Sequence, residues 1–163
     1  NGLFLLGNHD FKLARALRGD AVTRGEALAR TLAELPGDLR ERALAEISAA
    51  TGWLRHGALF FVHGGFHREM LREEPAPFPP GRPDRLLARA LYGQPTGRVT
   101  GAGKPERVLY WVNDIPAGMT VYCGHDRRSQ DGRPYVRDNA QGGRAVFMDT
   151  GAGKGGHLSW VDL

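Results

Sequence analysis

The sequence predicts an α/β fold. Three apolar runs of strand length, at residues 3–6, 58–62 and 119–123, each lead directly into glycine or histidine. Segments between these runs carry apolar residues at helical spacing. Sites in open α/β sheets form at the carboxyl ends of the strands. We therefore expect polar side chains from several strand ends to meet at one edge of one sheet.

Helices are expected in four segments. The tetrapeptide Thr23-Arg24-Gly25-Glu26 has the pattern of a capping box, in which the side chains of the first and fourth residues bond to each other's backbone. The two helices after it carry no chemistry and are expected to pack as a helical hairpin beside the site. The predicted helices run from Phe11 to Leu17, from Thr23 to Leu35, from Asp38 to Gly52 and from Arg85 to Leu91.

Two further strands are expected, at residues 145–148 and 157–161, the last of them at an edge. Residues 74–83 contain five prolines, which exclude a helix or a central strand. Residues 92–104 are rich in glycine. Both of these segments are predicted to be surface loops.

Composition sets the broad class. A chain of 163 residues with 25% charged and 41% hydrophobic residues is typical of one globular domain. No apolar stretch approaches the roughly 20 residues of a membrane-spanning helix, and no secretory signal is seen. The single cysteine, Cys123, cannot form an internal disulfide, which favours a reducing compartment such as the cytoplasm. The net charge of +4 is compatible with phosphate-bearing substrates but does not by itself indicate nucleic acid.

Three of the six histidines share one context. His9, His63 and His125 each follow an apolar run and lie beside glycine or one residue from it. Glycine allows the backbone to turn sharply off a strand and to approach an ion or phosphate closely. One such histidine is more often structural, but three in the same context favour a shared site. The remaining histidines are interpreted as structural: His56, His67 and His157.

The residues around these histidines suit metal-assisted proton transfer. The Asn8 side chain offers a hard, neutral oxygen ligand, His9 can protonate a leaving group near neutral pH, and Asp10 can orient it. Asp149 ends another strand and is either a ligand, a partner that holds a histidine, or a plain turn residue. One asparagine and two histidines, with or without an aspartate, suit Mn²⁺, Fe or Zn better than Ca²⁺ or Mg²⁺.

Several other site types are excluded. Gly-Ala-Gly-Lys occurs at 101–104 and at 151–154, but Pro105 and Gly155 follow where a phosphate-binding Walker loop needs Ser or Thr. Both segments are therefore predicted to be plain loops. One cysteine cannot supply a zinc-finger cluster, and no serine lies in a strained elbow of the kind that carries a catalytic triad.

The order of the motifs resembles a known superfamily. Gly7-Asn8-His9-Asp10, then His63-Gly64-Gly65 and then Gly124-His125 resemble the calcineurin-like metallophosphoesterases, in the branch of serine/threonine protein phosphatases and their bacterial relatives. Residues 91–97, 148–151 and 155–158 are similar to the phosphatase module of bacterial polynucleotide kinase-phosphatases. Diadenosine-tetraphosphate hydrolases share much of this layout, and the resemblance covers nearly the whole chain.

The resemblance implies a β-sandwich flanked by helices and a centre of two divalent metals, with Mn expected and Fe or Zn as alternatives. It makes Asn8, His63 and His125 ligands of the second metal. It makes His9 the general acid, with Asp10 as its acidic neighbour. Arg127 and Arg128 are candidates for phosphate contact, although adjacent arginines are more often only solvated.

The resemblance also predicts what lies outside the chain. Motifs of the form Asp-x-His and Gly-Asp-x-x-Asp-Arg, which supply the first metal's ligands, would precede residue 1. Residues 1–163 are therefore expected to be the carboxyl-terminal portion of a single domain of a longer protein. Many superfamily members carry a second histidine where Arg127 stands, and its absence favours the protein-phosphatase branch.

The expected function is hydrolysis of phosphate esters. A phosphoprotein, a dinucleoside polyphosphate and an RNA end all stay open as substrates. The alternative from another class is a catalytically incomplete fragment that acts as a binding module. No membrane partner is expected.

Overall fold

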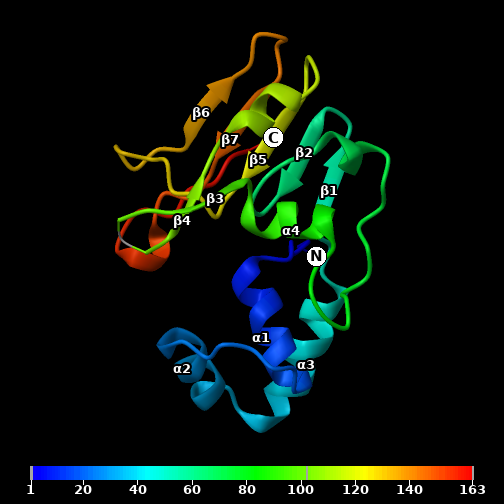
Figure 1. Ribbon diagram of the computed structural model, residues 1–163, viewed down its shortest axis with the longest axis vertical. Coiled ribbons are helices and arrows are strands. Elements are labelled where there is room, and N and C mark those ends of the chain that lie inside the picture. Colours follow the sequence, from blue (N-terminus) through cyan, green and yellow to red (C-terminus); the bar gives the residue numbers. More distant parts are fainter. Residues whose placement is uncertain (1, 102, 163) are drawn as a thin grey trace.

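The computed structural model describes residues 2–101 and 103–162 and confirms an α/β fold. A mixed five-stranded sheet occupies one end of the molecule, and helices α1 to α3 occupy the other (Figure 1). Helix α4 lies between these two parts. Within the described residues there is one such sheet and a separate two-stranded hairpin, and no second sheet packs on the first to form a sandwich.

The sheet has parallel strands at its centre and antiparallel strands at its edges. Strand β5 pairs in parallel with β2 on one side and with β7 on the other, so the carboxyl ends of these three strands share one edge. This confirms the strands predicted at 58–62, 119–123 and 145–148 to within a residue or so. In spatial order the strands are β1 (Trp53–His56), β2 (Leu59–Val62), β5 (Thr120–Cys123), β7 (Arg144–Phe147) and β6 (Tyr135–Asp138).

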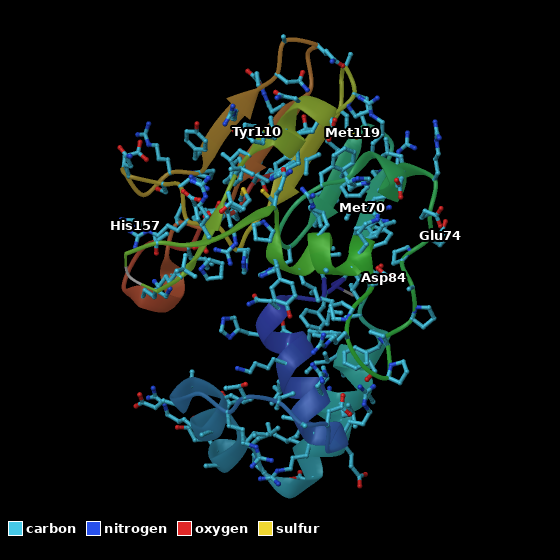
Figure 2. All side chains as sticks on the ribbon, in the orientation of Figure 1. Met70, Glu74, Asp84, Tyr110, Met119 and His157 are labelled. Carbon is cyan, nitrogen blue, oxygen red and sulfur yellow. The ribbon has the colours of Figure 1, made fainter. Side chains whose placement is uncertain are left out.

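Alternation along the central strands buries one face of the sheet. Phe60, Val121 and Phe147 are fully buried on that face, where helix α4 and two short 3-10 helices cover them. Met70 and Met119, labelled in Figure 2, belong to the same core. The opposite face is only half-buried. It carries Phe61 and Tyr122, whose rings stack with centroids 5.5 Å apart.

The four predicted helices are present. Helix α1 begins at Asn8 rather than Phe11, because the backbone already turns at Gly7. The capping box at Thr23 was wrong, since Gly25 caps α2 without any side-chain hydrogen bond. The predicted hairpin of α2 with α3 was also wrong: α3 packs chiefly on α1, and α2 buries no residue. The helices are α1 (Asn8–Arg18), α2 (Glu26–Glu34), α3 (Gly37–Ala49) and α4 (Arg85–Tyr92).

Three predictions about strands were wrong. Residues 3–6 form only one parallel bridge, between Leu5 and Thr51, because Leu3 and Phe4 are exposed. Residues 157–161 form no strand and make a single bridge from His157 to Gly151. The predicted loop at 92–104 contains strand β3 (Pro95–Val99), which pairs with β4 (Pro105–Arg107). β3 is exposed along its whole length, so it carries no apolar alternation that the sequence could reveal.

The remaining connections are loops and short 3-10 helices. The proline-rich segment 74–83 is a loop, as predicted. No helix in the two described stretches is long and apolar enough to cross a membrane. The 3-10 helices are η1 (Arg68–Leu71), η2 (Tyr110–Asp114) and η3 (Ala152–Lys154).

Candidate metal centre

Three side chains distant in sequence meet at the carboxyl ends of β2 and β5. Asn8 Oδ1 lies 2.9 Å from His63 Nε2 and 3.2 Å from His125 Nδ1, and the two ring nitrogens are 3.1 Å apart. Two atoms that are each about 2.1 Å from one cation lie about 3.0 Å apart at a right angle and about 3.4 Å apart at the tetrahedral angle. The three atoms, which we call the ligand triangle, are therefore spaced as ligands of a single cation.

Asn8 reaches the ligand triangle from the first turn of α1. The chain before it is held by a hydrogen bond of 2.9 Å, in which the Leu6 N–H donates to the Thr51 carbonyl. Gly7 then caps the helix, and its N–H donates to Asp10 Oδ2 at 3.2 Å. A β-carbon at Gly7 would lie 2.7 Å from that carboxylate and 3.3 Å from His63 Nδ1. Glycine is thus required for helix, carboxylate and imidazole to pack together.

The two histidines are aligned by an extension of the parallel sheet. His63 follows the last residue of β2, and the Gly124 N–H after β5 donates to the His63 carbonyl at 2.9 Å. His125 has a φ of 60°, and among the described residues no other non-glycine residue has a positive φ. Such a backbone conformation costs free energy and is concentrated at functional sites. It turns the His125 ring back toward His63.

Hydrogen bonds alone cannot account for the three contacts of the ligand triangle. An asparagine Oδ1 only accepts, and each ring nitrogen carries at most one hydrogen. Three mutual contacts would need three donated hydrogens, whereas the two nitrogens supply at most two. If both carried one, they would face each other as donors. A cation at the centre accepts an electron pair from all three atoms and removes this conflict.

Burial keeps both imidazoles neutral. Desolvation lowers the pKa of His63 below its usual value. Desolvation, followed by the positive charge that His63 would carry, lowers the pKa of His125 to about 4. Only neutral imidazole binds a metal, so at neutral pH both ligands are already in the competent form.

The ligand triangle opens into a pocket of about 610 Å³. His9 is exposed in this pocket and follows Asn8 in the chain. Asp149 also lines it, and its Oδ1 accepts a hydrogen bond of 2.9 Å from the Gly151 N–H. The other lining residues are Lys104, Pro105, Arg107, Asp126, Arg127, Gly151, Gly153 and Lys154.

Of the two arginines predicted to contact phosphate, only one lines the pocket. Arg127 lines it, and its guanidinium lies against Gly151, where a β-carbon would come within 2.8 Å of its Cζ. Arg128 instead forms an ion pair with Asp126, with its Nε 2.9 Å from Oδ2. Arg127 therefore remains a candidate for phosphate contact, whereas Arg128 is the ion-pair partner of Asp126.

Asp10 has a different place from the one predicted. Its carboxylate bonds to the Gly7 backbone, and it does not line the pocket. It thus positions the start of α1, and its role beside His9 stays a prediction. None of the histidines interpreted as structural lines the pocket. His67, for example, caps η1 by accepting from the Glu69 N–H.

Sequence reasoning missed three cations of the pocket: Lys104, Arg107 and Lys154. The Arg107 Nε donates to the Tyr92 carbonyl at 2.9 Å, which ties the β3–β4 hairpin to the end of α4. The two lysines close the Gly-Ala-Gly-Lys segments that were predicted to be plain loops. The repeated tetrapeptide was the signal that could have revealed them.

No group of three or more His, Cys, Asp or Glu side chains within residues 2–101 and 103–162 is arranged to hold a metal. The ligand triangle reaches three donors only because Asn8 adds an amide oxygen. No protein-family model matches the chain. No curated protein matches it either.

Proposed function

We propose that the chain carries part of the metal centre of a phosphoesterase of the calcineurin-like superfamily, in the protein-phosphatase-like branch. The observation that carries this proposal is the ligand triangle of Asn8, His63 and His125, with atoms 2.9 to 3.2 Å apart. The pocket around it supports the same chemistry, since it is lined by four cations that favour a phosphate group: Lys104, Arg107, Arg127 and Lys154.

The three residues of the triangle would hold one of two divalent cations, with Mn²⁺ expected and Fe or Zn as alternatives. Such metals polarise a phosphoryl group and lower the pKa of bound water from about 15.7 to about 7. His9 would donate a proton to the leaving oxygen, since it is exposed in the pocket beside Asn8. Arg127 would stabilise the charge of the phosphate oxygens.

The half-buried face of the sheet supports the expected β-sandwich. Phe61, Tyr122 and Val146 lie side by side on that face in register and are only partly covered. A second layer packed there would bury these side chains.

Calorimetric titration with Mn²⁺ tests the ligand triangle directly. We expect the metal-free chain to bind about one equivalent, with the affinity lowered at least 10-fold by His63→Ala or by His125→Ala. His56→Ala is the matched control, because His56 is an exposed histidine on β1 outside the pocket. Equal affinity in all four proteins would refute the metal centre.

Hydrolysis of p-nitrophenyl phosphate tests the reaction. In a form of the protein that includes the upstream motifs, we expect turnover that depends on Mn²⁺. His9→Ala should lower kcat by about 10²- to 10⁴-fold, the usual contribution of a general acid. It should leave Mn²⁺ binding intact, because His9 is not in the ligand triangle.

The same two measurements distinguish the phosphoesterase from the alternative, a binding module without catalysis. Mn²⁺ uptake and phosphate binding without any turnover in the longer form would favour that alternative. It draws support from the small number of protein ligands in the triangle, since three donors leave half of the positions of an octahedral ion open.

A further inference from the structure

Both Gly-Ala-Gly-Lys segments of the chain reach the pocket. Neither has the sequence of a Walker loop, because Pro105 and Gly155 follow the lysines. They lie far apart in the sequence, one in the turn of the β3–β4 hairpin and the other after β7. Nevertheless Lys104 and Lys154 line the same pocket as the ligand triangle.

Each lysine is presented by a tightly closed turn. In the first, the Thr100 N–H donates to the Lys104 carbonyl at 2.7 Å, and the Gly103 N–H donates back to the Thr100 carbonyl at 2.8 Å. In the second, the N–H groups of Lys154 and Gly156 both donate to the Gly151 carbonyl at 2.8 Å.

The second turn is closed at its base as well. The Thr150 hydroxyl donates to the carbonyl of His157. Figure 2 labels His157 on the side of the molecule where η3 lies. Gly151 and Gly155 have φ of 85° and 75°, values that favour glycine, so this turn depends on its glycines.

Lysine is rare in this chain but is found twice in this pocket. The chain has 22 lysines and arginines, of which only three are lysines, and two of those three line this pocket. The third, Lys12, lies on α1 outside it. Lysine carries a compact point charge that binds phosphate oxygens.

The charges of the two lysines are also available to a ligand. Both side chains are exposed, and neither forms an ion pair within the described residues. Of the two acids that line the pocket, Asp126 is neutralised by Arg128 and Asp149 bonds to the Gly151 N–H. A pocket of about 610 Å³ falls within the roughly 300–1,000 Å³ of small-molecule sites and is far larger than one phosphate needs.

We propose that Lys104 and Lys154 bind the distal phosphates of a substrate that carries a chain of two or more phosphoryl groups. This inference rests on the proposed function, in which the phosphate to be hydrolysed lies at the ligand triangle. The two lysines would then select an oligophosphate over a phosphate monoester. A nucleoside polyphosphate and an inorganic oligophosphate share this chemistry.

Binding to the metal-free chain tests the lysines without relying on the metal centre. We compare inorganic triphosphate with inorganic phosphate by calorimetry at one low ionic strength, because salt screens such contacts. The wild type should prefer triphosphate by at least about 10-fold, or roughly 1.4 kcal/mol. The double variant Lys104→Gln/Lys154→Gln should lose this preference, because its affinity for triphosphate should fall by at least about 10-fold.

Lys12→Gln is the matched control for charge, and it should bind triphosphate as the wild type does. All three replaced lysines lie outside the core. Circular dichroism checks that the variants fold. Adding ATP separates the two sources. Tighter binding of ATP than of triphosphate indicates a nucleoside polyphosphate, and equal binding indicates the phosphate chain alone.

The proposal is overturned if the wild type binds triphosphate and phosphate equally, or if the double variant keeps the preference. These outcomes are independent of the Mn²⁺ titration. If the wild type binds no Mn²⁺ but shows a lysine-dependent preference for triphosphate, the metal centre alone is refuted. Mn²⁺ binding without that preference would refute the lysine site alone.

Discussion

His125 is held in an unfavourable state in three respects. Its φ is 60°, its Nε2 is buried with no hydrogen-bond partner among the described residues, and its pKa is lowered to about 4. The left-handed backbone and the unpaired nitrogen each cost free energy in the folded protein, and the lowered pKa adds a cost where the pH falls below about 6.5. Such costs persist only where the surrounding structure enforces them, here through the bond from Gly124 to the His63 carbonyl. A cation on Nδ1 would compensate for part of the cost.

The lowered histidine pKa values predict how stability depends on pH. In the unfolded chain both His63 and His125 titrate near pH 6.5, whereas in the folded chain both pKa values are lower. The unfolded chain therefore binds more protons as the pH falls from about 6.5 to about 4. The free energy of unfolding of the metal-free protein should be level above about pH 7 and should fall through this window.

Urea unfolding in EDTA over this range measures the effect. His125→Asn should flatten the decrease, because the variant no longer has a histidine whose protonation favours the unfolded chain. His56→Asn should follow the wild type, since His56 is exposed on β1. A decrease that is equally steep in His125→Asn would show that other groups cause it.

At the level of elements, the end of β2 passes very close to the end of α4. The Gly64 N–H bonds to the Ala90 carbonyl at 2.5 Å. A β-carbon at Gly64 would lie 2.6 Å from the Gly93 nitrogen and 2.9 Å from the Ala90 oxygen, both of them backbone atoms that cannot rotate away. This close approach sets the direction in which the chain leaves β2, and with it the position of His63.

Gly64→Ala should therefore destabilise the fold by about 1–3 kcal/mol, the range typical of overpacking. Chemical denaturation measures this change. Gly81→Ala is the control, because nothing lies within 4 Å of a β-carbon there, and it should change stability by less than about 0.5 kcal/mol. Equal stability of the two variants would mean that α4 can shift away from β2 without cost.

At the level of the whole molecule, the site joins two separate cores. His63 and His125 follow strands of the core around the sheet, which includes Phe60 and Trp111. Asn8 belongs to α1, whose Phe11 packs in a second core with α3 and α4. Figure 1 shows α4 between the sheet and α1, and residues of α4 belong to both cores. A cation bound by the ligand triangle would link one core to the other.

Metal binding should accordingly stabilise the whole chain. At a free Mn²⁺ concentration of 100 times Kd, the gain is about 2.7 kcal/mol. For a chain of this size it corresponds to a rise in Tm of about 5–10 °C. A thermal melt with Mn²⁺ and then with excess EDTA measures the rise and its reversal. His63→Ala should show no rise, and a rise of the same size in that variant would place the cation elsewhere.

The sequence was most informative where hydrophobic pattern and motif coincide. The strands before His63 and His125 were predictable because buried strands read as short apolar runs, and the sharing of one sheet edge followed from that. Strands β3 and β6 were not predictable, because they are exposed along their length and have no apolar face. The start of α1 was missed because Gly7 caps it through its backbone rather than through a side chain.

By itself the sequence determined the α/β class and the central strands, because local pattern carries that information, and the resemblance of its motifs singled out Asn8, His63 and His125. Only the tertiary structure decided that the three atoms of the ligand triangle lie within 3.2 Å of one another. It also decided that Asp10 caps a helix and that Lys104 and Lys154 line the same pocket. Distances between residues far apart in the chain depend on how sheet and helices pack, and no local pattern encodes that packing.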